Sequence, residues 1–173
     1  MQHKMRNIVL IGMPGVGKST IGVILAKELG YQFLDTDICI QQQEDCLLKD
    51  LIAVYGVDGF IAIENQFIAS IDVQGCVIAT GGSAVYGRDA MEHLKEIGTI
   101  IYLKLPYEEL KYRLGNLKGR GVVLKSGQTL KHIFAERCIL YEMYADYVID
   151  ESNLDVEKTL QKILNLKISL QKD

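Results

Sequence analysis

Short apolar runs alternate with longer stretches of helical periodicity at the start of the chain. The apolar run at residues 8–11 has the length of a buried strand, and apolar side chains then recur at helical spacing over 17–29. Gly30 follows at a position where helices commonly end. A second apolar run at residues 31–34 predicts another strand. The chain is therefore expected to begin as strand, helix, strand.

The same alternation continues to the end of the chain. Gly56 and Gly59 are expected to mark a turn, and residues 43–45 a break in the helical pattern before it. The remaining helices are expected at 38–55, 60–73, 89–96, 106–114, 129–144 and from 156 onward, and the remaining strands at 76–80, 99–103 and 147–149. This order indicates an α/β fold of three layers, with about five parallel strands covered by helices on both faces.

Length and composition agree with a single soluble domain spanning residues 1–173. The chain is 49% hydrophobic and 24% charged, and none of its apolar runs approaches the length of a membrane span. A net charge of −3 gives no basic surface for nucleic acid. The four cysteines form no C-x-x-C pair and the N-terminus has no apolar leader, so we expect reduced thiols in the cytoplasm. The expected partner is a small-molecule substrate, with no nucleic acid and no membrane, and the expected state is a monomer.

Residues 12–20 carry the strongest chemical signal in the sequence. They have the G-x-x-x-x-G-K-[ST] spacing of a phosphate-binding loop and lie between a predicted strand and a predicted helix. Glycines let backbone N–H groups surround an anion, and the helix N-terminus adds partial positive charge. Lys18 is expected to reach the β- and γ-phosphates of ATP, and Ser19 to bind Mg²⁺. The loop residues expected to bind the nucleotide are Gly12, Gly15, Val16, Gly17, Lys18, Ser19 and Thr20.

Two further clusters of residues follow predicted strands. Asp35 and Asp37 come directly after the second strand, where ligands bind in open α/β sheets, so they are candidates for Mg²⁺ and for a substrate hydroxyl. The alternative for Asp37 is that it only caps the next helix. Gly81 and Gly82 follow the third strand and would let the backbone approach a substrate, although a plain tight turn explains them equally well.

The segment 114–128 is the most irregular part of the sequence. Its four glycines and interspersed polar side chains are typical of a lid that closes over a site. Arg120, between Gly119 and Gly121, is the candidate to contact the phosphates and to act in catalysis. The alternative is an ordinary solvated arginine.

Together these motifs resemble the shikimate kinase family, in the nucleoside-monophosphate-kinase-like branch of P-loop proteins. The resemblance covers residues 7–166 and implies a parallel sheet with a lid, and an enzyme that phosphorylates an alcohol group, that of shikimate, with ATP. The motifs that carry it are residues 12–20, Leu34-Asp35-Thr36-Asp37, Gly56-x-x-Gly59-Phe60-x-x-x-Glu64, Ile78-Ala79-Thr80-Gly81-Gly82, Arg120 and Glu136-Arg137-x-x-Leu140-Tyr141.

The resemblance implies roles for the residues that bind ATP. Lys18 and the loop amides hold the phosphates, and Ser19 binds Mg²⁺. Asp35 holds a water molecule of the metal shell, and Arg120 stabilises charge on the transferring phosphoryl group. These roles agree with phosphoryl transfer, in which positioning and electrostatics supply nearly all of the catalysis.

The resemblance implies a second set of roles for the substrate. Asp37 orients or deprotonates the attacking hydroxyl, Gly82 approaches the substrate by its backbone, and Arg137 pairs with the substrate carboxylate. The family pattern also has an arginine for this carboxylate where this chain has Ile61. Ile61 either lines an apolar wall of an altered pocket or extends the apolar surface of its helix, with the arginine's role moved elsewhere. The other departures are Ser83 for a third glycine, residues 121–123 for Pro-Leu-Leu in the lid, and Asn153 for an arginine near the adenine.

Three functions are compatible with this set of residues. The first is the phosphorylation of shikimate, with its carboxylate held by Arg137 alone or by Arg137 and a lysine. The second is a kinase of the same mechanism for another small hydroxylated metabolite, because Ile61 replaces the arginine. The third is a nucleotide-binding module without kinase activity, which the retained phosphoryl-transfer residues argue against. A nucleotide acceptor is disfavoured because the chain has only five arginines.

Overall fold

The computed structural model describes residues 6–115, 122 and 124–166. Its core is a five-stranded sheet with the order β2-β3-β1-β4-β5, in which every strand pair is parallel. The strands are β1 (Asn7–Ile11), β2 (Gln32–Asp35), β3 (Cys76–Ala79), β4 (Gly98–Lys104) and β5 (Tyr147–Asp150). The predicted α/β fold is confirmed. Because the strands are parallel, all their carboxyl ends lie along one edge of the sheet.

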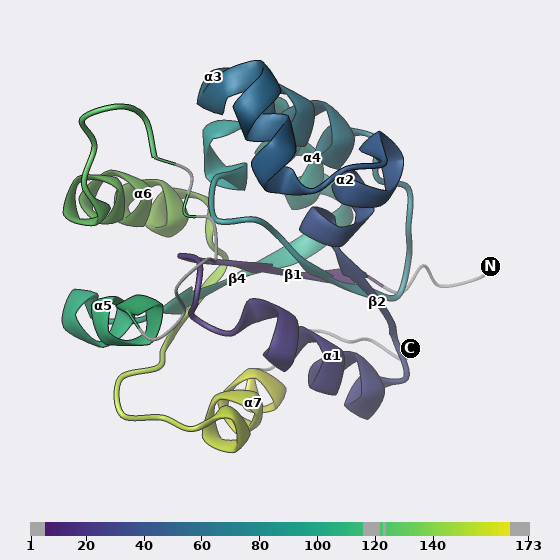
Figure 1. The fold of residues 1–173 in the computed structure, drawn as a ribbon. Helices are drawn as coiled ribbons and strands as arrows, with labels where there is room; N and C mark the ends of the chain where they lie inside the picture. Colours follow the sequence, from purple (N-terminus) through teal and green to yellow (C-terminus); the bar gives the residue numbers. More distant parts are fainter. Residues whose placement is uncertain (1–5, 116–121, 123, 167–173) are drawn as a thin grey trace.

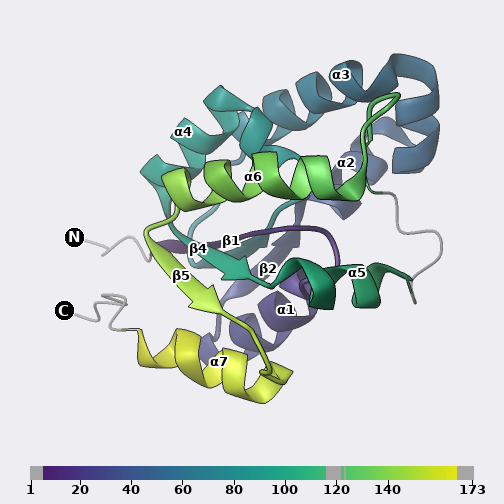
Figure 2. The same ribbon diagram turned by 90° about the vertical axis from the view of Figure 1, so that its left-hand side faces the viewer.

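Helices cover both faces of this sheet, as Figure 1 shows. α1 (Lys18–Leu29) and α7 (Val156–Asn165) lie on one face. The other face carries α2 (Thr36–Glu44), α3 (Leu48–Ala69), α4 (Arg88–Ile97) and α6 (Leu130–Tyr144), and Figure 2 shows the same two layers from the side. α5 (Tyr107–Gly115) follows β4 beyond the carboxyl edge. The chain therefore forms the three layers that the sequence predicts.

The central strands are apolar throughout because helices bury them on both sides. Ile8, Val9, Leu10 and Ile11 of β1 are at most 1% exposed, and every residue of β3 is buried. Continuous apolar runs, rather than alternation with polar residues, are characteristic of such strands. The same burial explains why these runs were recognisable as strands in the sequence.

The segment between β2 and β3 differs most from its prediction. The expected break near 43–45 is confirmed, because α2 ends at Glu44 and Asp45 adopts a positive φ of 52°. The turn expected at Gly56 is a kink within α3, where φ is 70° and ψ is 178°. α3 therefore runs from Leu48 to Ala69 instead of beginning at residue 60 and ending at 73. A short 3₁₀ helix, η1 (Ala84–Tyr86), was not predicted.

α3 is also long and apolar enough, by length and composition alone, to cross a membrane. Charged residues interrupt its apolar runs, so no single run within it has the length of a membrane span. Its backbone is not continuously helical, since Gly56 divides it, and Leu51, Phe60 and Ile68 are buried in the fold. α3 thus packs one side on the fold, while most of its other residues are half-buried or exposed.

Candidate active site

The phosphate-binding loop connects β1 to α1 and depends on glycine at several positions. Gly12 has a φ of 148°, and a Cβ atom there would lie 2.7 Å from the carbonyl oxygen of Leu103. Gly15 and Gly17 have φ values of 87° and 99°, in the left-handed region that favours glycine. Gly17 is the N-cap of α1, so the loop leads directly into a helix N-terminus. This strand, loop and helix match the arrangement that binds phosphate groups.

Lys18 is buried at the first position of α1. Its Nζ atom donates to the carbonyl oxygens of Gly12 at 2.7 Å and Met13 at 2.9 Å. Burial lowers the pKa of Lys18 to about 8, an effect that the nearby carboxylates of Asp37 and Asp35 partly oppose. The ammonium group is thus held inside the loop, where bound phosphates would meet it.

Asp35, at the end of β2, joins the loop to the next helix. Its Oδ2 atom accepts a hydrogen bond from the Ser19 hydroxyl at 2.6 Å. Its Oδ1 atom accepts from the backbone N–H groups of Asp37 and Ile38, so Asp35 is the N-cap of α2. The alternative in which Asp37 caps this helix is wrong, and the Asp37 side chain is left to face the site.

The donor atoms of Ser19 and Asp35 fit a magnesium ion. A hydroxyl and a carboxylate oxygen lie next to each other at the edge of the phosphate loop. Magnesium usually takes one or two such protein oxygens and completes its shell with water and phosphate oxygens. In the part of the chain that the structure describes, no group of three or more His, Cys, Asp or Glu side chains forms a separate metal site.

Asp37 and Glu64 approach each other across Gly81. A Cβ atom at position 81 would collide with Glu64 Oε1 and would lie 2.7 Å from Asp37 Oδ1. The backbone N–H of Gly81 donates to the buried Thr36 hydroxyl, which fixes this close approach. Burial first, and then Asp35, raises the pKa of Asp37 to about 6, while Lys18 opposes the shift. Gly81 is therefore required by side-chain packing as well as by the course of the backbone.

Glu64 is a buried carboxylate that Ser83 partly satisfies. The side chain is 1% exposed, and its Oε2 atom accepts a hydrogen bond of 2.5 Å from the Ser83 hydroxyl. Its Oε1 atom has no hydrogen-bond partner among the described residues. Burial is the main cause that raises the pKa of Glu64 to about 7, against the opposing effects of Ser83 and Arg137.

Arg137 reaches the site from α6 and is also buried. Its Nε atom donates to the Tyr86 hydroxyl at 3.3 Å, and its guanidinium carbon lies 5.2 Å from the centre of the Tyr86 ring. A Cβ atom on Gly82 would lie 3.2 Å from Arg137 Nη1, so the guanidinium group stands beside the Gly82 backbone. The Tyr141 hydroxyl donates to the Gly82 carbonyl at 2.6 Å. η1 and α6 thus position Arg137 and Gly82 together.

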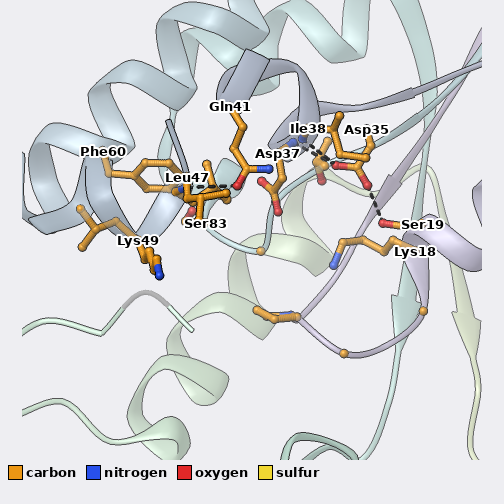
Figure 3. Close-up of a pocket in the computed structure, with 18 of the residues that line it drawn as sticks. Lys18, Ser19, Asp35, Asp37, Ile38, Gln41, Leu47, Lys49, Phe60 and Ser83 are labelled. Atoms are coloured by element: carbon orange, nitrogen blue, oxygen red, sulfur yellow. Dashed lines mark hydrogen bonds between the residues drawn. The ribbon is translucent and has the colours of Figure 1, made fainter. Parts of the chain in front are cut away.

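One cavity of about 920 Å³ joins these groups. Figure 3 shows Lys18 and Ser19 on one side, Asp37 in the middle, and Phe60 and Lys49 on the other side. We call the first part the phosphate-loop end and the second the α3 end. The phosphate-loop end is lined by Pro14, Gly15, Gly17, Lys18, Ser19, Thr20 and Asp35, and the α3 end by Leu47, Leu48, Lys49, Ile52, Phe60 and Ser83. The remaining lining residues are Asp37, Ile38, Gln41, Thr80, Gly81, Gly82 and Arg137.

Some of the expected site residues do not line this cavity. Gly12 and Val16 belong to the phosphate-binding loop but do not line the cavity, and the Val16 side chain is buried in the core. Ile61 is half-buried on α3 and is not one of the described residues that line the cavity. Arg120 lies outside the described residues, with the rest of 116–121 and residue 123 of the expected lid. In contrast, Lys49 lines the cavity and was not predicted.

The tyrosines and Thr36 that support the site were not predicted either. Tyr86 acts through Arg137, which is 51 residues away in sequence. Tyr141 acts through the backbone of Gly82, which is 59 residues away. Tyr141 belongs to the motif that contains Arg137, and this was the one available signal for it. Nothing in the sequence around Tyr86 indicates a partner on α6.

Comparison with known proteins agrees with this geometry. A family model described as shikimate kinase matches residues 14–167. The chain is similar to shikimate kinase of Clostridium botulinum (strain Okra / Type B1), with 38% identity over 165 residues, covering 92% of this chain and 95% of that protein. It is also similar to shikimate kinase 2 of Dickeya chrysanthemi, with 34% identity, covering 83% of this chain and 86% of the other.

Solved structures show the same similarity. Shikimate kinase from Acinetobacter baumannii, in complex with shikimate, superposes with a TM-score of 0.85 at 31% identity and covers 98% of this chain and 96% of that one. Thymidylate kinase from Candida albicans, at 15% identity and a TM-score of 0.58, shares the fold alone. The family model and the relatives above 30% identity show that this chain belongs to the shikimate kinase family.

Proposed function

We propose that the protein transfers the γ-phosphoryl group of ATP to a hydroxyl group of shikimate. The observation that carries the proposal is the single cavity in which Lys18, Asp37 and Arg137 all take part. The phosphate-binding loop for ATP, a carboxylate for the acceptor hydroxyl and a cation for the acceptor carboxylate then line the same cavity. Membership of the family and the similarity to a shikimate complex support the same substrate.

At the phosphate-loop end, the chain supplies fixed positive charge and two oxygen ligands. The Lys18 ammonium would donate to phosphate oxygens in place of the carbonyls that it now contacts. Ser19 and Asp35 would hold Mg²⁺, which when bound neutralises charge on the phosphates. Ser19 and Asp35 are held next to each other before ATP arrives, whereas Lys18 exchanges its two carbonyl contacts for phosphate oxygens.

In the middle of the cavity, Asp37 would act on the attacking hydroxyl group. Its pKa of about 6 leaves it ionised at neutral pH, so it can accept the hydroxyl hydrogen bond and orient the oxygen. A carboxylate with a pKa near the working pH can also take up the proton as the new bond forms. Arg137, held by Tyr86, would face the carboxylate of the substrate.

The lid and Arg120 stay predictions, because Arg120 lies outside the described residues. If Arg120 stabilises the transferring phosphoryl group, Arg120→Ala lowers kcat at saturating ATP by about 10²-fold or more. Unchanged turnover in this variant would show that the arginine has no part in transfer. The cytoplasmic location and the monomeric state also stay predictions.

The direct experiment is to measure ADP release with Mg-ATP and shikimate, against a control without the acceptor. We expect shikimate-dependent turnover, with shikimate 3-phosphate as the product by mass spectrometry. If shikimate does not raise ADP release above the control while ATP still binds, the acceptor is another small hydroxylated molecule. If ATP does not bind either, the kinase function itself is wrong.

A further inference from the structure

Lys49 places a positive charge at the α3 end of the cavity. It is the second residue of α3, it is exposed, and its side chain lines the cavity beside Leu48. In Figure 3, Lys49 lies with Phe60 on the side away from Lys18, with Asp37 between them. Lys49 makes no ion pair with any residue that the structure describes. Its ammonium group is therefore available to a ligand in the cavity.

The charges around Arg137 bear on how strongly this one arginine attracts an anion. The buried guanidinium of Arg137 acts electrostatically on both Glu64 and Lys18, and Asp37 acts on Glu64. Glu64 thus stands near this arginine, and Asp37 stands near Glu64. The ionised forms of these acids offset part of the attraction of Arg137 for a substrate carboxylate. Anion binding in the cavity therefore gains from another positive charge placed away from Glu64.

Position 61 does not supply that charge. In the family pattern an arginine stands there, but this chain has isoleucine, which offers an anion no hydrogen bond. Ile61 also does not line the cavity, whereas Lys49 does. Both residues lie on α3, one on each side of the kink at Gly56. A lysine side chain is flexible and carries its charge at the end of a four-carbon stem, so it can reach a ligand from the first turn of the helix.

We propose that Lys49, together with Arg137, binds the carboxylate of the acceptor substrate and takes over the role that an arginine at position 61 has in the family pattern. This inference rests on the proposed function and makes Lys49 a specificity residue for the acceptor. The apolar side chains of Leu48, Ile52 and Phe60 would face the ring of the substrate while Lys49 contacts its charge. Lys49 lies on the opposite side of the cavity from Lys18 in Figure 3, so it would act on acceptor binding alone.

The test compares Lys49→Met with Lys131→Met. Lys131 is the second residue of α6, is exposed and does not line the cavity, so it matches Lys49 in helix position and accessibility. For Lys49→Met we expect the KM for shikimate to rise about tenfold, because one charge contact with the substrate carboxylate is lost. We expect kcat and the KM for ATP to change less than about twofold, because neither involves this contact. Lys131→Met should match the wild type in all three constants.

Shikimate methyl ester separates recognition of the carboxylate from general damage to the site. The ester lacks the negative charge, so Lys49→Met should not change its KM, and the preference of the enzyme for shikimate over the ester should fall about tenfold. Lys49→Arg should retain the preference. Ile61→Arg in the Lys49→Met background should restore it, since an arginine then stands where the family pattern has one.

The outcomes separate this inference from the proposed function. Suppose that the wild type turns over shikimate, but Lys49→Met raises the KM equally for shikimate and for the ester. This result would overturn the role of Lys49 and leave the proposed function standing. An unchanged KM for shikimate would do the same. A wild type without shikimate-dependent turnover would overturn both.

Discussion

The two ends of the cavity are built in different ways. The phosphate-loop end comes from residues 14–20 and Asp35, and its key groups are held by backbone conformation and by Asp35 as a helix cap. The α3 end is assembled from the start of α3, its middle and Ser83, and α6 adds Arg137 between the two ends. A site whose shape depends on backbone conformation tolerates few substitutions. A site lined by side chains changes its shape and charge with each substitution. The departures at Ile61 and Ser83 lie at or beside the α3 end.

Lys18→Met should break the phosphate-loop end with the largest effect. We expect kcat/KM for ATP to fall about 10³-fold, because the ammonium that meets the phosphates is lost. The free energy of unfolding should not fall, because burial in the folded protein disfavours the charged form of Lys18, as its lowered pKa shows. Steady-state kinetics and thermal unfolding measure the two effects. Lys27→Met, at an exposed position of the same helix, should leave both unchanged, and a loss below tenfold in Lys18→Met would contradict the role of Lys18.

Asp37→Asn tests the junction of the two ends. We expect kcat to fall about 10²–10³-fold, because the amide orients the hydroxyl poorly and cannot accept its proton. In the wild type, kcat/KM should fall as the pH drops below about 6, since Asp37 with its raised pKa is then protonated. The residual activity of Asp37→Asn should lack this acidic limb between pH 5 and 8. Asp50→Asn, an exposed position of α3, is the control and should keep the wild-type profile.

Glu64→Gln sharpens the comparison through stability. The folded state raises the pKa of Glu64 from 4.5 to about 7, so the protonated form is favoured there. The stability from this group is fully present below about pH 4.5 and is lost as the pH rises through 7. Glutamine keeps an oxygen for the Ser83 hydroxyl without the charge. At pH 8 the variant should therefore gain about 1–3 kcal/mol in free energy of unfolding over the wild type, and much less at pH 5.

Urea unfolding at the two pH values measures this difference. Glu142→Gln is the control, because Glu142 pairs with Lys104 at a half-exposed site where the change should stay within about 0.5 kcal/mol. An equal effect of Glu64→Gln at both pH values would show that the charge of Glu64 does not oppose folding. Burial also raises the pKa of Glu151 to about 7. The free energy of unfolding of Glu64→Gln should therefore still depend on pH, but less steeply than that of the wild type.

Ser83→Ala has the smallest expected effect. It removes the hydroxyl that donates to Glu64 and should cost about 1–2 kcal/mol in free energy of unfolding at pH 8. In the Glu64→Gln background the cost should be smaller, because the remaining buried group is uncharged. Equal costs in both backgrounds would mean that the hydroxyl does not serve the carboxylate. Urea unfolding of the four proteins of this cycle gives the coupling directly.

Sequence analysis recovered the parts of the molecule that depend on contiguous residues. The continuous apolar runs of β1 and β3 predicted buried parallel strands. Gly30 ended its helix, and the last helix began at Val156, as expected. The glycines and Lys18 of the phosphate loop were equally clear, since their conformation follows from a local pattern. What these residues share is that their neighbours in space are also their neighbours in sequence.

The supporting contacts of the α3 end were not predictable in the same way. Ser83 and Glu64 are 19 residues apart, and Arg137 and Tyr86 are 51 apart. Each pair meets only because helices pack on one face of the sheet, which no local pattern specifies. The kink at Gly56 appeared as a turn for a similar reason, because the packing of α3 continues the helix past a glycine that favours its end.

The strand order places β3 between β1, which leads into the phosphate loop, and β2, which ends in Asp35. Two interstrand spacings, about 10 Å in all, therefore separate the backbones that carry the phosphate loop and the acids. Backbone hydrogen bonds set this width, so side-chain substitutions do not change it. The spacing between the phosphate loop and Asp35 is thus constant, and the kind of molecule accepted can change through the side chains that line the rest of the cavity.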